Sequence, residues 1–180
     1  MINFLKFAIL VGLSLLVLSS IAYGSTKAVK GFSHRNEIII KDTLINPVKN
    51  NISLRDSIVN FGMQLLGTPY VMAASGKNGF DCSGFVYFVF QHFKIKVPRS
   101  SSQFNNFGKD IPIGSVKKGD ILVFLSPTRN VIGHVGIVTK ANGMESDFIH
   151  ASSGRDMKVI ITSLKKPGYT RRFIKAVRVL

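Results

Sequence analysis

The chain has 180 residues, and its 24 Lys and Arg against 9 Asp and Glu give a formal net charge of +15 with neutral histidines. This length suffices for one ordinary domain with a short appendage and disfavours a second full domain. The charge favours polyanions as partners, such as envelope carboxylates and phosphates, acidic lipids or nucleic acid, but it is scattered enough that solubility alone would also explain it.

Residues 1–24 have the pattern of a secretory signal peptide. Lys6 precedes an apolar stretch over residues 7–18, and small residues follow up to Gly24. The alternative is a membrane anchor, but the apolar stretch is shorter than the roughly 20 residues of a spanning helix. We therefore predict an exported protein, periplasmic or secreted, that has no membrane span after cleavage. Export favours envelope partners, and we expect no nucleic-acid partner.

Residues 25–51 are polar and basic, with a short β-like run at Glu37 to Lys41 and Pro47 after it. This segment is too short for an independent wall-binding module. We predict a tether or an added edge element here, followed by one folded domain over residues 52–180.

The folded domain is expected to begin with a helix. Apolar residues from Ile58 to Leu66 recur at helical spacing, Ser53 is a candidate N-cap, and Gly67-Thr68-Pro69 would end the helix. After a loop, the run Ser83 to Phe93 is apolar on nearly every side, which predicts a helix buried all round.

Cys82, the only cysteine, stands at the start of this second helix. In an exported chain it has no intramolecular disulfide partner, so we expect a free thiol. An inert buried thiol is the ordinary alternative. However, a helix N-terminus favours thiolate over thiol and supplies N–H donors to an oxyanion, so the position predicts a nucleophile with a lowered pKa.

Strands are expected in the second half of the domain, separated by Pro, Gly and Asn turn signals. Helices followed by an antiparallel sheet describe an α+β fold. The expected strands span residues 120–125, 134–140, 147–152, 159–163 and 173–180.

Two histidines, His134 and His150, lie on consecutive expected strands joined by residues 141–146 with an Asn142-Gly143 turn signal. The midpoint of the two positions falls inside that connection, so both rings can lie on one face of an antiparallel pair. Imidazole suits proton transfer near neutrality, and we assign His134 as the base of Cys82 and His150 as its orienting group. A one-residue slip in register would turn a ring away.

A metal site built from the same three residues is the weaker alternative. It lacks the close spacing and second cysteine typical of zinc ligands. The chain also contains no phosphate-binding P-loop and no Gly-x-Ser-x-Gly nucleophile elbow. We expect no metal and no cofactor.

Six motifs occur in order over about residues 55–178, and together they resemble the NlpC-type family of cell-wall peptidases. The motifs are Gly67-Thr68-Pro69-Tyr70, Asp81-Cys82-Ser83-Gly84-Phe85, Pro98-Arg99-Ser100-Ser101-Ser102-Gln103, Lys118-Gly119-Asp120-Ile121, Gly133-His134-Val135-Gly136 and His150-Ala151. The resemblance implies a papain-like cysteine peptidase core, with N-terminal helices packed on a C-terminal antiparallel sheet. It also implies hydrolysis of peptide bonds in peptidoglycan stems.

The resemblance assigns roles to individual residues. Cys82 would be the nucleophile, His134 the base, His150 the third polar residue, and Tyr70 a contributor to the oxyanion hole. The residues implied in binding the D-glutamyl side of the substrate are Asp81, Ser83, Arg99 and Ser101. Asp81 has an equally ordinary reading as the N-cap of the central helix, and Arg99 as a surface charge.

One segment departs from the family pattern. After Tyr70 the family commonly has an aromatic residue and two glycines, whereas this chain has Val71-Met72-Ala73-Ala74. Met72 can serve as an adaptable apolar wall, but the loss of two glycines restricts the backbone.

These observations predict an exported, monomeric cysteine endopeptidase that acts on peptidoglycan or muropeptides, with the bond between D-glutamate and diaminopimelate as the expected target. One alternative is a non-catalytic basic protein that binds the envelope through the same scaffold. Another is an amidase or acyltransferase that uses the same thiol with a different acceptor.

Overall fold

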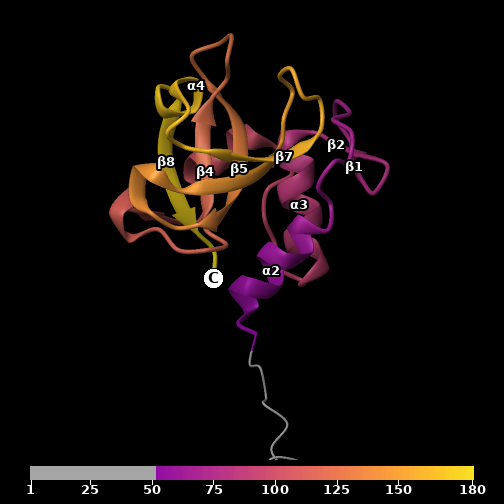
Figure 1. Cartoon of the computed structure of the whole chain (residues 1–180), viewed down its shortest axis with the longest axis horizontal. Coiled ribbons are helices and arrows are strands. Elements are labelled where there is room, and N and C mark those ends of the chain that lie inside the picture. Colours follow the sequence, from indigo (N-terminus) through magenta and orange to yellow (C-terminus); the bar gives the residue numbers. More distant parts are fainter. Residues whose placement is uncertain (1–51) are drawn as a thin grey trace, which may run out of the picture. The chain divides into compact units, whose positions relative to one another are not determined.

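The computed structural model of the chain describes residues 52–180, which form a helical part and a sheet (Figure 1). The expected signal peptide at 1–24 and tether at 25–51 lie outside the described residues. Across residues 52–180, no helix has the length and apolarity that a membrane crossing would require.

Helix α2 (Leu54–Met63) begins at the predicted N-cap. The Ser53 hydroxyl accepts a hydrogen bond from the Asp56 N–H at 3.1 Å. The helix ends at Met63 rather than reaching Leu66, and a turn then leads to Gly67, whose φ of 82° is readily available only to glycine.

Helix α3 (Cys82–His92) is the predicted central helix. Its first half is buried, but Tyr87 and Phe88 are half-buried and Gln91 and His92 are exposed, so the prediction of burial all round is wrong for its outer side. Beside its first turn lies a hairpin of strands β1 (Ser75–Gly76) and β2 (Gly79–Phe80). A Cβ at Gly84 would overlap the Ala74 carbonyl oxygen, so this close approach requires glycine.

A six-stranded antiparallel sheet follows, with strand order β3-β8-β4-β5-β6-β7. All five predicted strands are confirmed, with bounds shifted by up to two residues. The strands are β3 (Lys109–Ile111), β4 (Ile121–Leu125), β5 (Ile132–Lys140), β6 (Asp147–Ala151), β7 (Val159–Ser163) and β8 (Phe173–Arg178). Strand β3 was not predicted, because its three residues are mostly exposed and show no apolar alternation.

Short helices fill the connections. They are η1 (Ser101–Asn106), η2 (Ile113–Ser115), η3 (Gly143–Glu145) and α4 (Pro167–Thr170). Of these, α4 matters most for the site, since it carries Tyr169 to the face of the sheet on which the histidines lie.

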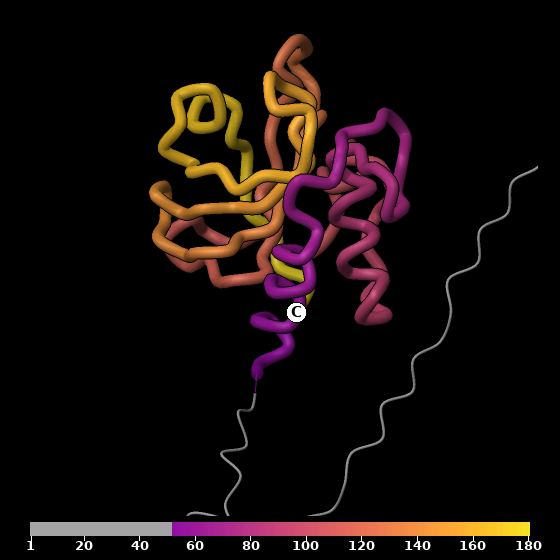
Figure 2. The backbone as a smooth tube through the Cα atoms, turned by 45° about the vertical axis from the view of Figure 1, so that its right-hand side comes forward, coloured from indigo at the N-terminus to yellow at the C-terminus, as the bar shows by residue number. Residues whose placement is uncertain are grey.

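Both faces of the sheet are covered, and β4 shows how. Ile121 and Val123 pack in the core shared with α2 and α3, whereas Leu122 and Phe124 pack in a second cluster on the opposite face. This alternation follows from the two-residue period of a strand. In Figure 2 the helices lie along one side of the strands, and the first turn of α3 approaches the beginning of β5, an interior strand of the sheet.

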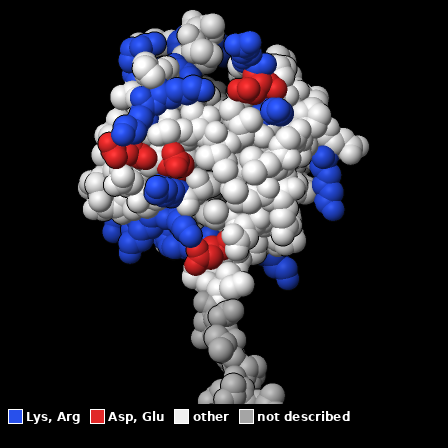
Figure 3. All heavy atoms as spheres, viewed as in Figure 1, with Lys and Arg blue, Asp and Glu red and all other residues white. Residues whose placement is uncertain are grey.

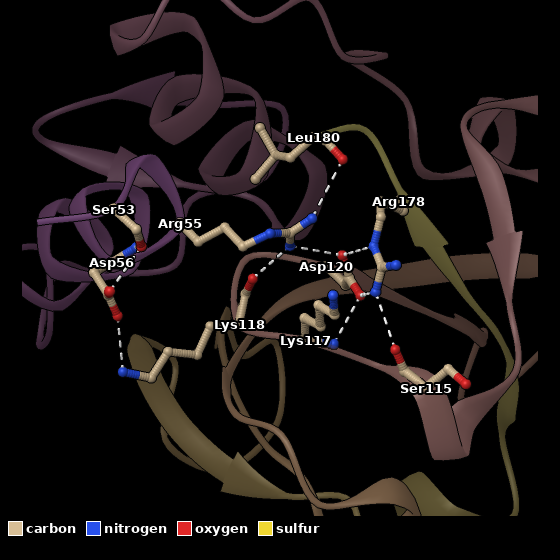
Figure 4. A network of polar contacts seen from close by, with 9 residues as sticks. All are labelled: Ser53, Arg55, Asp56, Ser115, Lys117, Lys118, Asp120, Arg178 and Leu180. Atoms are coloured by element: carbon tan, nitrogen blue, oxygen red, sulfur yellow. Dashed lines mark hydrogen bonds and ion pairs between the residues drawn. The ribbon is translucent and has the colours of Figure 1, made fainter.

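A buried carboxylate ties the helical part to the sheet (Figure 4). Asp120, whose side chain is fully buried, accepts from Arg55 of α2 at 3.0 Å and from Arg178 of β8 at 2.6 Å. It also accepts from the Lys117 N–H at 2.8 Å. Arg55 donates in addition to the carbonyl oxygens of Lys118 and Leu180, so α2 and the C-terminus are held together.

Candidate active site

Cys82 is the first residue of α3, as the sequence predicted, and its thiol is free. The sulfur lies 3.6 Å from the Gly133 carbonyl oxygen, immediately before His134 on β5. The structure therefore brings the helix start and the histidine-bearing strand together, although they are about fifty residues apart in the sequence.

The prediction of a lowered thiol pKa is wrong. Burial raises the pKa of the Cys82 thiol, and the neighbouring Asp81 carboxylate raises it further. Backbone N–H groups, including that of Ser83 at the helix start, lower the pKa, but they do not outweigh burial. The resting site therefore holds a neutral thiol, and attack requires a base.

His134 and His150 face each other, which confirms the predicted antiparallel strand pair with both rings on one face. The register differs by two residues from a direct pairing, because Ile137 lies opposite Ile149 and Gly136 therefore lies opposite His150. Nε2 of His134 lies 3.0 Å from Nδ1 of His150, with the two rings perpendicular. Gly136 provides the room, because a Cβ there would lie 3.1 Å from the His150 Cβ and closer still to the Phe148 ring. A side chain at this position would push the second histidine away from the first.

His150 has two further partners that the sequence analysis did not identify. Its Nε2 lies 3.1 Å from the Thr162 hydroxyl on β7 and 3.4 Å from the Tyr169 hydroxyl on α4. Thr162 is one of two polar residues at the end of the predicted strand over 159–163, and nothing in the sequence pointed to Tyr169.

These contacts constrain the proton positions. For Nδ1 of His134 to accept the thiol proton, its Nε2 must carry hydrogen and donate to Nδ1 of His150. His150 then carries its own hydrogen on Nε2 and donates it to an oxygen. The Thr162 hydroxyl is the nearer acceptor and thus favours the tautomer in which His134 is a base.

We expect Thr162→Val to lower kcat about tenfold with little change in KM, because the His150 N–H loses its nearer acceptor in a buried site. Thr162→Ser should restore most of the rate, since the hydroxyl returns while the methyl group is lost. Steady-state kinetics on the three proteins measures this. A Val variant as fast as wild type, or a Ser variant as slow as Val, would show that the hydroxyl does not position the ring.

Burial dominates the titration of both imidazoles. It lowers the pKa of His134 well below 6.5, with the charges of His150 and Arg172 acting in the same direction. Burial also lowers the pKa of His150 to about 3. Both rings are therefore neutral in the resting protein.

The pH dependence of kcat/KM should reflect the lowered pKa of His134. His134 can act as a base only when neutral, and its lowered pKa keeps it neutral into the acid range. We expect the acid limb of kcat/KM to lie well below pH 6.5, measured in buffers of constant ionic strength. An acid limb at 6.5 or above would mean that the base titrates like a solvent-exposed histidine.

Tyr70 lies near the thiol. Burial raises the pKa of its hydroxyl, and the negative charge that Cys82 carries as a thiolate and the Asp81 carboxylate raise it further. Its backbone is held from two sides, by a bridge to Phe80 and by a hydrogen bond from its N–H to the Met157 carbonyl oxygen at 2.9 Å. A neutral hydroxyl fixed in this way can donate to an oxyanion.

The other predicted binding residues form one cluster. Asp81 caps α3 by accepting from the Gly84 N–H at 2.6 Å, and Arg99 pairs with both of its carboxylate oxygens at 2.9 and 2.8 Å. Arg99 also lies 3.2 Å from the Ser83 hydroxyl, so its reading as a mere surface charge is wrong. Ser101 lies on η1, outside these contacts.

Arg99 also braces the segment that departs from the family pattern. It donates to the carbonyl oxygens of Ala73 at 2.7 Å and Ala74 at 3.2 Å. Ala73 adopts a φ of 60°, a left-handed conformation that favours glycine. The backbone thus keeps a glycine-like shape with alanine in place, and Met72 beside it is 82% exposed.

The chain is similar in sequence to known proteins of one family. The model of the NlpC/P60 family matches residues 67–178. Murein DD-endopeptidase MepS/murein LD-carboxypeptidase of Escherichia coli K12 is 32% identical over 141 residues, covering 78% of this chain and 70% of that protein. Gamma-D-glutamyl-L-lysine dipeptidyl-peptidase of Bacillus cereus is 31% identical over 126 residues, covering 69% of this chain but only 36% of the relative.

A solved structure has the same fold. The crystal structure of an NlpC/P60 family protein from Bacillus cereus superposes with a TM-score of 0.64 at 29% sequence identity. The match covers 71% of this chain and 41% of that one. This likeness agrees with the papain-like α+β fold that the motifs implied.

Proposed function

Because the chain belongs to the NlpC/P60 family and is thus a cysteine-type peptidase, we propose that Cys82, His134 and His150 hydrolyse peptide bonds in peptidoglycan stems. One observation carries the proposal: a free thiol at the start of a helix contacts the backbone of Gly133, the residue before His134, and His134 is hydrogen-bonded to His150. This arrangement combines a nucleophile, a base and an orienting group.

The proposed reaction begins with a neutral thiol and a neutral imidazole. As the C–S bond forms, the thiol proton passes to Nδ1 of His134. The Tyr70 hydroxyl and the backbone N–H of Cys82 stabilise the oxyanion. The C–N bond then breaks, and the same proton goes to the leaving amine. His134 next removes a proton from water, which attacks the thioester and frees the thiol.

The acyl half of the substrate would lie along the α3 side of the site, where Asp81, Ser83 and Arg99 form a cluster, with Ser101 on η1 outside it. Since the donors of Arg99 already serve Asp81 and two carbonyl oxygens, we assign it the role of holding the Asp81 carboxylate in place. Asp81 would meet a free stem amine.

Two bonds are candidates. The bond between D-glutamate and diaminopimelate was expected from the motifs, and a relative named gamma-D-glutamyl-L-lysine dipeptidyl-peptidase supports it. The other candidate joins two D-configured residues, and a relative named murein DD-endopeptidase supports that one.

The surface charge suits an exported protein that works in the cell envelope. Basic side chains stand out at the upper end and at the lower left of the face drawn in Figure 3. Among the described residues, Arg129, Lys158 and Lys166 have no ion-pair partner. They remain available to wall carboxylates and phosphates.

Mass spectrometry of digestion products tests the proposal. The purified protein and its Cys82→Ala variant are incubated with peptidoglycan and with soluble muropeptides. Cut stems from the wild type alone support the peptidase and identify the bond, while a product carrying a new acyl acceptor would indicate a transferase. Intact stems from both proteins, together with co-sedimentation on the wall, would favour a binding protein instead.

A further inference from the structure

A small cavity lies on the sheet side of the candidate site, beside His134. Its volume is about 120 Å³, and its lining includes His134, Ser153, Tyr169 and Arg172. None of its lining residues comes from the segment between Tyr70 and Ser101 that carries the thiol and the acyl-side cluster. The cavity is therefore separate from the residues assigned above to the acyl half of the substrate.

Arg172 is the charged group of this cavity, and its guanidinium is already held in place. Nε donates to the Gly168 carbonyl oxygen at 2.7 Å, and Nη1 donates to the Leu125 carbonyl oxygen at 3.1 Å. The guanidinium carbon lies 4.9 Å from the centre of the Tyr169 ring. The side chain is thus oriented before any ligand arrives.

The remaining nitrogen, Nη2, donates to no backbone or acidic oxygen among residues 52–180. In the same part of the chain Arg172 forms no ion pair, and the Tyr169 hydroxyl is its other polar neighbour. The cavity lining contains no acidic residue. A fixed, partly buried cation with a spare donor is suited to bind an anion, and a carboxylate matches a guanidinium best.

The position of the cavity indicates which carboxylate of the substrate would bind Arg172. In the proposed reaction His134 protonates the leaving amine, and His134 itself lines the cavity. The Tyr169 ring lies 6.0 Å from the His134 ring and carries Arg172 on its face. An α-carboxylate is only two bonds from its amine nitrogen, so a leaving residue in contact with His134 would direct this group toward Arg172.

We propose that Arg172 binds a free α-carboxylate on the amino acid whose amine is released, so that the enzyme selects bonds followed by such a residue. The proposal rests on the proposed peptidase function and narrows it. It favours the crosslink between two D-centres, where the diaminopimelate carboxylate beside the amide is free. It disfavours the D-glutamyl bond inside a stem, where that carboxyl group is itself in a peptide bond.

A pair of substrates tests this. Crosslinked muropeptide dimers are prepared with a free carboxylate or a carboxamide beside the crosslink amide, and kcat/KM is measured for both. We expect the wild type to prefer the free carboxylate by about 10- to 100-fold, because one charge-assisted hydrogen bond is lost with the amide. In Arg172→Gln the preference should fall to within about threefold.

The ratio of kcat/KM for the two substrates, measured on one protein, is insensitive to a general loss of activity. Arg171→Gln is the matched control, since it removes a neighbouring exposed charge outside the cavity lining and should keep the wild-type ratio. Arg172→Lys keeps the charge and should retain part of the preference even if Gln disturbs α4. A wild-type ratio in Arg172→Gln would overturn the proposal.

Binding separates this inference from the catalytic proposal. The free-carboxylate dimer is titrated calorimetrically into Cys82→Ala protein with and without Arg172→Gln. Arg172-dependent binding without any wild-type cleavage would support the cavity and overturn the peptidase. Cleavage without preference for the carboxylate would support the peptidase and overturn the cavity's role.

Discussion

Replacing Cys82 with alanine is expected to lower the rate of stem-peptide hydrolysis by about three to six orders of magnitude, because no acyl-enzyme can form without the sulfur. The fold should survive, since the side chain is small and its sulfur makes one long contact with a backbone oxygen. Quantitative chromatography of products from a defined muropeptide, with long incubations for the variant, measures the loss.

Gln91→Ala is the matched control for this variant. It lies on the same helix but is exposed, at the end opposite the thiol, and should keep the wild-type rate. Circular dichroism and thermal melting show whether both variants are folded. Near-wild-type cleavage by folded Cys82→Ala protein would exclude Cys82 as the nucleophile.

Replacing Asp120 with alanine is expected to reduce the free energy of unfolding by about 3–5 kcal/mol, because it leaves Arg55 and Arg178 without their buried carboxylate. For a domain of this size, that loss corresponds to a fall in Tm of about 10 °C or more. Urea titration and thermal melting at neutral pH measure both quantities.

Asp110→Ala provides the comparison. Asp110 also pairs with a basic residue, Lys175, but its side chain is 67% exposed. Exposed ion pairs contribute about 0–1 kcal/mol, so this variant should unfold almost like the wild type. Equal losses in the two variants would mean that burial of the Asp120 network does not determine its contribution.

The sequence was sufficient to predict what depends on local pattern. Apolar periodicity located α3 and the five long strands, and Ser53 gave the start of α2. The placement of His134 and His150 on one face of an antiparallel strand pair followed from the turn signal between them, whereas the register, with Gly136 opposite His150, did not. These features need only neighbouring residues or one hairpin.

The features that the sequence did not predict depend on contacts between distant segments. Thr162, Tyr169 and Arg172 meet the histidines only because β7 and α4 fold onto the same face of the sheet. The thiol pKa was predicted wrongly for the same reason: the helix start is a local feature, whereas burial depends on the packing of the whole site. Arg99 showed no sign in the sequence of its pairing with Asp81.

The hydrogen bond from Arg55 to the Leu180 carbonyl has a practical consequence. It holds the two ends of the described domain side by side, at the end of the molecule away from α4 and the neighbouring loops (Figure 1). A fusion partner or a surface linkage at either end would therefore lie away from α4, whose Tyr169 lines the cavity beside His134. A short peptide joining the two ends should also give a circular permutant whose new termini can be placed in an exposed loop.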